Sequence, residues 1–140
     1  SKLEKAKASG ADFGFNYLEP DWTEQALKAT GGFDVIIDGA SGDSINQLIQ
    51  VCKPGGRIVL YGATMGLPSK LEARKVYWNQ LKIMGSTMGS DLDFQNMIAL
   101  VKEKQIRPAV DRVFSFENAV SAFDLMKAGD QFGKIVLTPD

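Results

Sequence analysis

The sequence predicts an α/β fold built on a parallel sheet, and three apolar segments are the main evidence for this class. Runs rich in β-branched residues occur at residues 35–37, 58–61 and 135–137. Their apolar residues are continuous and do not alternate with polar ones, which is typical of strands covered on both faces. Segments with helical apolar spacing lie between these runs, as expected when strands and helices alternate.

The first elements of the chain continue this alternation. Residues 1–12 are charged and helical in character, and residues 11–17 are expected to form a short strand. Asp21 and Glu24 have the spacing of a capping box, which marks the start of a second helix. The pair Gly31 and Gly32 is expected to end that helix, because glycine readily adopts the left-handed conformation found after a helix.

A crossover helix is predicted over residues 43–52, between the first two strands. Its apolar residues recur at i, i+3, i+4 and i+7, on Ile45, Leu48, Ile49 and Cys52. Asp43 or Ser44 is expected to cap its start, and Pro54 follows its end. Because Cys52 shares the apolar stripe, we interpret it as a buried core thiol with no catalytic role.

Two further amphipathic helices are predicted in the second half of the chain. One carries an apolar stripe formed by Phe94, Met97, Ile98 and Val101. The other carries a stripe formed by Ala119, Ala122, Phe123 and Met126, with Ser115 as its expected cap and Gly129 at its end. We interpret both stripes as core packing.

Composition excludes several classes of function. At 140 residues and 44% hydrophobic content, the chain is expected to form one domain with a single core. Sixteen basic residues against 17 acidic ones give a net charge of -1 without long cationic runs, so no nucleic-acid partner is expected. The apolar runs are too short to span a bilayer and no apolar signal segment is present, so we expect a cytoplasmic protein without a membrane partner.

The chain contains no histidine and one cysteine. A Ser-His-Asp triad, acid-base catalysis by histidine, a disulfide within the chain and a recognisable zinc site are therefore excluded for these residues. The composition predicts no catalytic residue and no metal ligand in this segment.

Two glycine-bearing turns follow the first two predicted strands, at residues 39–42 and 62–66. In an open parallel sheet, ligands bind outside the carboxyl ends of the strands, where such turns lie side by side. Small residues there allow the backbone to approach a ring or a ribose, although tight turns alone would also explain them. Asp38 has two open interpretations, a turn-forming carboxylate or a ligand-facing one. Neither a GxGxxG nor a GxxxxGK[ST] motif is present to hold phosphates.

Two families share parts of this pattern. The segments "FDVIID" and "VCKPGGRIVLYG" are similar to the second half of many S-adenosylmethionine-dependent methyltransferases. A longer resemblance runs through "KLEKAKASGADFGFNY", "FDVIIDGASGD", "KPGGRIVLYGATMG", "LKIMGSTMGS" and the ending "FENAVSAFDLMKAGDQFGKIVLTPD". These segments resemble the coenzyme-binding half of medium-chain dehydrogenases/reductases, in the zinc-type alcohol dehydrogenase-like and quinone oxidoreductase group.

This resemblance implies an incomplete Rossmann-like parallel sheet. In the family, a first strand, a glycine-rich diphosphate loop and a second strand precede the segment that begins here. Residues 1–140 are therefore expected to be a partial nucleotide-binding domain of a larger oxidoreductase. That enzyme would transfer hydride between NADP or NAD and an alcohol, a carbonyl or a quinone. The chain alone is expected to be inactive, and any zinc would belong to the missing catalytic domain.

The resemblance also implies cofactor-binding positions. Lys2 and Tyr17 match residues that contact the 2'-phosphate of NADP, and a lysine and a phenol are suited to hydrogen-bond phosphate. Positions that line the ribose and nicotinamide are matched by Gly39, Ala40, Gly62, Ala63 and Thr64, and the stretch that meets the carboxamide is matched by Ser86, Thr87 and Met88. Gln131 falls where relatives carry an asparagine near the cofactor. The edge strand at residues 81–85 matches the strand that pairs two subunits, so a homodimer is expected.

Two alternatives remain open at the level of sequence. In the first alternative, the chain is a non-catalytic dimerisation or regulatory module. In the second, it is part of a methyltransferase. The return of the chain through "FGKIVLTP" after two further helices disfavours the methyltransferase.

Overall fold

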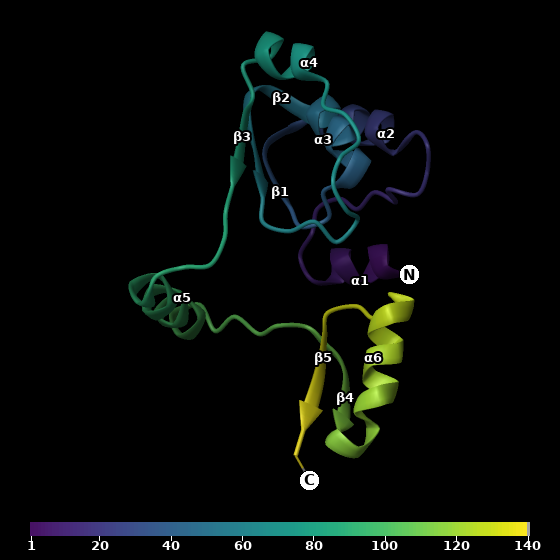
Figure 1. The fold of residues 1–140 in the computed structure, drawn as a ribbon, viewed down its shortest axis with the longest axis vertical. Coiled ribbons are helices and arrows are strands. Elements are labelled where there is room, and N and C mark those ends of the chain that lie inside the picture. The colour runs from purple at the N-terminus through teal and green to yellow at the C-terminus, as the bar shows by residue number, and fades with distance from the viewer. Residues whose placement is uncertain (140) are drawn as a thin grey trace. The chain divides into compact units, whose positions relative to one another are not determined.

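The computed structural model describes residues 1–139 and divides the chain into two compact units, each described here by itself (Figure 1). Residues 13–88 form one unit, which we call the central unit. Residues 1–12 and the segment from Gly89 onward form the other, which we call the terminal unit. The length of the chain did not predict this division.

The central unit contains a three-stranded parallel sheet in the order β1-β2-β3. Its elements are α2 (Trp22–Thr30), β1 (Phe33–Asp38), the 3-10 turn η1 (Gly42–Ser44), α3 (Ile45–Val51), β2 (Cys52–Leu60), α4 (Ala73–Trp78) and β3 (Lys82–Gly85). The helices α2 and α3 lie together on one face of this sheet (Figure 1). The predicted strand-helix-strand unit and the predicted edge strand are confirmed.

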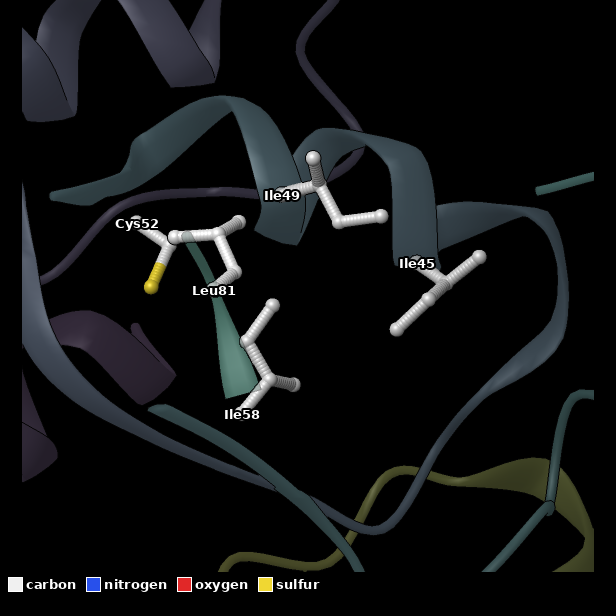
Figure 2. Close-up of a cluster of buried hydrophobic side chains, with 5 residues drawn as sticks. All are labelled: Ile45, Ile49, Cys52, Ile58 and Leu81. Atoms are coloured by element: carbon white, nitrogen blue, oxygen red, sulfur yellow. The ribbon is translucent and has the colours of Figure 1, made fainter. Parts of the chain in front are cut away.

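The core of the central unit lies between α3 and the sheet. Figure 2 shows five buried side chains that point toward one another, from Ile45, Ile49, Cys52, Ile58 and Leu81. Ile49 and Ile58 are fully buried, and burial of a side chain of this size contributes roughly 1.5–3 kcal/mol. Cys52 is the first residue of β2 and lies in this core, so its predicted role as a buried thiol is confirmed.

A second cluster joins α2 to the end of α3 through Trp22, Ala26 and Val51. The partly buried Ile36 and Leu48 pack against both clusters, so the two form one continuous apolar layer. This layer covers only one face of the sheet. On the other face, Val35 is 47% exposed and Ile37 is 72% exposed. Val35 and Ile37 belong to β1, so the expectation that β1 is covered on both faces is wrong for the central unit taken by itself.

The terminal unit contains a parallel pair of strands, β4 and β5, with α6 packed beside them (Figure 1). Its elements are α1 (Lys2–Ala8), α5 (Asp91–Glu103), β4 (Val110–Ser115), the 3-10 turn η2 (Phe116–Asn118), α6 (Ala119–Ala128) and β5 (Lys134–Thr138). The mostly buried carboxylate of Asp111 lies 3.7 Å from the ammonium of Lys5 and accepts a hydrogen bond from the backbone of Phe132. These contacts link α1 to the strand pair.

Three local predictions were wrong. Residues 11–17 form no strand, because no strand in residues 1–139 lies beside them to complete a hydrogen-bonded ladder. Asp21 precedes α2 as predicted, but its side chain makes no capping bond to the helix backbone and instead accepts a hydrogen bond from Gln25. The residue that caps α6 is Asn118, since Ser115 precedes the intervening turn η2.

The apolar stripes of α5 and α6 do not form the core that the sequence predicted. No residue of α5 is buried, and Phe94 is 62% exposed. In α6 only Ala122 is buried, whereas Phe123 and Met126 are more than half exposed. Both helices are amphipathic, but their large apolar side chains remain exposed in the structure of residues 1–139. No helix within residues 1–139 is long and apolar enough to cross a membrane.

Candidate functional site

The two glycine turns lie side by side at the carboxyl ends of β1 and β2, where the sequence placed them. Backbone hydrogen bonds join them: Thr64 donates to the carbonyl of Gly39 at 3.3 Å, and Met65 donates to the carbonyl of Ala40 at 2.9 Å. Gly42 in turn donates to the carbonyl of Gly66 at 2.9 Å. The turns therefore form one continuous edge that presents backbone and small side chains.

Backbone contacts leave no room for a side chain at Gly62 and Gly42, whereas the obstacle at Gly39 is the exposed side chain of Tyr61. A Cβ atom on Gly62 would lie 2.8 Å from the carbonyl oxygen of Gly39, and one on Gly39 would lie 2.7 Å from the ring of Tyr61. Gly42 has a φ of +64° and a similarly crowded position against Met65. Tight packing of the turns thus accounts for Gly42 and Gly62, whatever ligand lies against them.

Asp38 builds the first turn. Its carboxylate accepts hydrogen bonds from the backbone of Ala40 at 3.0 Å and of Ser41 at 2.8 Å. These bonds hold Ser41 at a φ of 56°, which is unusual for a residue other than glycine. Of the two interpretations of Asp38, the turn-forming one is confirmed, although the residue also borders the pocket described next.

A pocket of about 910 Å³ opens beside the turns, within the central unit. Most of its wall is apolar, with Tyr17, Trp22 and Leu48 among the lining residues. Ala40 and Thr64 bring the two turns into the same wall. A pocket of this size and character is typical of sites for small organic ligands and cofactors.

One side of the pocket is formed by residues 66–72, which we call the strap. The carboxylate of Asp43 accepts hydrogen bonds from both the backbone and the hydroxyl of Ser69, each at 2.7 Å. The bonds from Ser69 hold the pKa of Asp43 below its ordinary value. The side chain of Asn46 donates to the carbonyl of Lys70 and accepts from the backbone of Glu72.

The sequence did not identify the strap or its anchors. Asp43 or Ser44 was expected to cap the crossover helix, and Ser44 occupies the cap position, although it makes no side-chain capping bond. Asp43 and Asn46 bond to residues that lie 24 to 26 positions later in the chain. No local spacing signals a contact of that range.

The remaining predicted site residues fall in several places. Tyr17 is 66% exposed at the pocket wall, and Ala63 lies in the second turn. Ser86, Thr87 and Met88 follow β3, where Ser86 donates to the carbonyl of Leu60.

Two predicted residues, Lys2 and Gln131, belong to the terminal unit. The ammonium of Lys2 donates to the carbonyl of Gly129, which ends α6. The side-chain oxygen of Gln131 is buried without a hydrogen-bond partner. An unsatisfied buried acceptor is unusual in a folded protein.

Within residues 1–139, no group of three or more His, Cys, Asp or Glu side chains could hold a metal ion. Burial raises the pKa of the Cys52 thiol, which keeps it in the unreactive protonated form. The site therefore offers a shaped surface with hydrogen-bond donors and acceptors.

Comparison with known proteins places this geometry in context. A family profile described as zinc-binding dehydrogenase matches residues 9–137. A zinc-type alcohol dehydrogenase-like protein of Leptosphaeria maculans is 32% identical over 97% of this chain and 40% of its own length. The synaptic vesicle membrane protein VAT-1 of Tetronarce californica is 31% identical over 91% of the chain and 40% of its own length.

The fold also matches solved structures. The crystal structure of an NAD-dependent alcohol dehydrogenase superposes with a TM-score of 0.89 and 34% identity. The match covers 99% of this chain and 41% of that protein. The α/β architecture with parallel sheets of three and two strands thus agrees with a partial Rossmann-like fold. The chain spans about two fifths of the length of these relatives.

Proposed function

This chain belongs to the zinc-binding dehydrogenase family, and we propose that it is the cofactor-binding portion of a longer NAD(P)-dependent oxidoreductase. That enzyme would transfer hydride between the nicotinamide ring and an alcohol, a carbonyl or a quinone. The observation that carries the proposal is the paired edge of glycine turns at the carboxyl ends of β1 and β2. In open α/β sheets, this is the edge at which dinucleotides bind.

The pocket beside the turns suits the adenosine part of the cofactor. Its volume of about 910 Å³ is ample for a nucleoside, and Tyr17, Trp22 and Leu48 supply flat or apolar wall. Asp38 and Asp43 also border it, but their carboxylates already accept hydrogen bonds from backbone or serine groups. We propose that the ribose and nicotinamide lie along Gly39, Ala40 and the second turn.

The family assigns the diphosphate to a glycine-rich loop that these 140 residues do not contain. Each charge-assisted hydrogen bond from such a loop contributes about 1.5–3 kcal/mol, so losing several weakens binding by orders of magnitude. We propose that the 140-residue chain by itself binds the dinucleotide weakly and transfers no hydride. We propose that any zinc of the longer enzyme is held by residues outside this segment.

The choice between NADP and NAD is proposed to depend on Lys2 and Tyr17. Each side chain is exposed within its own unit, and an ammonium or a phenol suits a 2'-phosphate. A charge-assisted bond worth roughly 1.5–3 kcal/mol corresponds to a preference for NADPH of about ten-fold to somewhat over a hundred-fold. One similar solved structure is described as an NAD-dependent alcohol dehydrogenase, so a preference for NADH is the opposite possible outcome.

Kinetics of the full-length enzyme test this choice. We expect kcat/KM to be higher for NADPH than for NADH, and the ratio to fall toward one after Lys2→Ala or Tyr17→Phe. Lys28→Ala on α2 is a matched control, because it also removes an exposed lysine and should leave the ratio unchanged. A ratio near one that neither Lys2→Ala nor Tyr17→Phe alters would disprove the assignment. Absence of activity with both cofactors would disprove the proposed function itself.

We further propose that the protein forms a homodimer through a sheet edge. In the described residues β3 pairs only with β2, and β1 likewise has one neighbour, so each strand has an open edge. Open edges pair readily with another chain, and pairing of identical edges gives a two-fold dimer. Light scattering should therefore detect a dimer at micromolar concentration, and a clean monomer would refute this proposal. A cytoplasmic location also stays a prediction, which cell fractionation would test.

A further inference from the structure

A second hollow lies at the opposite end of the three-stranded sheet from the glycine turns. Its volume is about 300 Å³, and its lining residues are Asp34, Pro54, Gly55, Gly56, Arg57 and Lys82. Asp34 is the second residue of β1 and Lys82 is the first residue of β3. The hollow is therefore near the amino-terminal ends of these strands, and its wall is mainly polar.

Two cations in this hollow are direct neighbours in the sheet. Arg57 of β2 is the register partner of Lys82 of β3, and on its other side it is the partner of Val35 of β1. Register partners in adjacent strands are about 4.8 Å apart and project from the same face. Like charges in this arrangement repel each other and destabilise the sheet.

The carboxylate in the hollow does not neutralise this pair. Asp34 is bonded to the ammonium of Lys53 at 2.9 Å, and this bond lowers the pKa of Asp34 more than the charge of Arg57 does. No ion pair of Arg57 or Lys82 occurs within residues 1–139. The hollow thus contains Arg57 and Lys82 beside a carboxylate that Lys53 already pairs, so it carries an excess of positive charge.

We propose that this hollow is an anion site that binds a phosphate group between Arg57 and Lys82. A guanidinium presents paired N-H donors that match two oxygens of a phosphate, and the lysine ammonium adds a third donor. The volume is several times the roughly 30 Å³ that one water takes up, so it accommodates a phosphate with its remaining hydration. The phosphate is either free inorganic phosphate or the terminal group of a phosphate monoester.

This site is separate from the proposed dinucleotide edge, because the glycine turns follow the carboxyl ends of β1 and β2. Its residues take no part in the proposed dinucleotide binding, although Lys82 lies in β3, whose open edge is a proposed dimer contact. The two proposals can therefore fail independently.

Titration calorimetry on the 140-residue chain tests the site with inorganic phosphate and with glycerol 3-phosphate, at constant ionic strength set with chloride. We expect a dissociation constant of about 1 mM or lower for at least one probe. Arg57→Gln and Lys82→Gln should each weaken that binding at least about ten-fold. Lys28→Gln removes an exposed lysine of α2 outside the hollow and should leave it unchanged.

Thermal unfolding gives a second readout, and its first comparison needs no phosphate. Without phosphate at low salt, Lys82→Gln should unfold at a higher temperature than the wild type, because it removes the repulsion from Arg57. Added phosphate should raise the midpoint of the wild type more than that of the variant. Binding of only one probe identifies the source of the phosphate. Binding of neither probe, or equal binding by the wild type and both hollow variants, would overturn the proposal.

Discussion

The contact between the two glycine turns can be tested by a single added methyl group. Gly62→Ala would place a Cβ atom 2.8 Å from the carbonyl oxygen of Gly39, whereas ordinary contact begins at 3.4 Å. The turns would have to separate by about 0.6 Å, since the obstacle is backbone and not a movable side chain. Overpacking of this kind costs typically 1–3 kcal/mol.

Two smaller effects modify this cost. Separation of the turns would weaken the bond from Thr64 to Gly39, and one such bond contributes about 0.5–1.5 kcal/mol. Alanine also reduces the conformational freedom of the unfolded chain, which stabilises by about 0.4–1 kcal/mol. These two smaller effects nearly cancel, so the overpacking cost remains. We therefore expect Gly62→Ala to lower the free energy of unfolding by about 1–3 kcal/mol.

Gly85→Ala is the matched control. A Cβ atom on Gly85 meets nothing within 4 Å, and its φ is not in the left-handed region. This substitution should leave stability unchanged or raise it by up to about 1 kcal/mol. Urea unfolding of the 140-residue chain, followed by far-ultraviolet circular dichroism, measures both variants. Equal stability of the two variants within about 0.5 kcal/mol would refute the argument that the turns are closely packed.

Two further predictions concern the core and the strap. Ile49→Ala should destabilise the chain by about 2–5 kcal/mol in the same urea experiment, because Ile49 is fully buried, whereas Met97→Ala on the exposed surface of α5 should change stability by less than about 0.5 kcal/mol. Equal losses would show that the core lies elsewhere. Asp43 has a lowered pKa in the folded chain, so its contribution to stability is present above its ordinary pKa of 3.8 and is lost as pH falls through the folded value. The stability difference between wild type and Asp43→Asn should therefore shrink below pH 3.8, and a difference that is independent of pH would contradict the contact with Ser69.

The elements that the sequence predicted well are those whose signal is local and strong. The continuous apolar residues of β1 and β2, and the helical spacing of Ile45 and Ile49, specify a strand-helix-strand unit without knowledge of the rest of the chain. The position of both glycine turns follows from that unit, because parallel strands end at the same edge.

The errors arose where a residue's role depends on distant parts of the chain. Residues 11–17 have the composition of a strand, but a strand forms only where a neighbour supplies hydrogen bonds. Phe94 and Phe123 have the spacing of core residues, but burial requires a surface that covers them. The bonds that anchor the strap at Asp43 join residues 26 positions apart, beyond the reach of any motif.

The central claim is that a nicotinamide dinucleotide binds along the paired turns and the adjacent pocket. Titration of the isotope-labelled 140-residue chain with NADP⁺, followed by NMR, tests this claim directly, because NMR detects even weak complexes residue by residue. We predict that the largest shifts occur at the backbone amides of Gly39, Ala40 and Thr64 and at Tyr17, with a dissociation constant in the range of about 1 mM or weaker. An absence of shifts at saturating NADP⁺ and NAD⁺, or shifts confined to residues outside the turns and the pocket, would contradict the account.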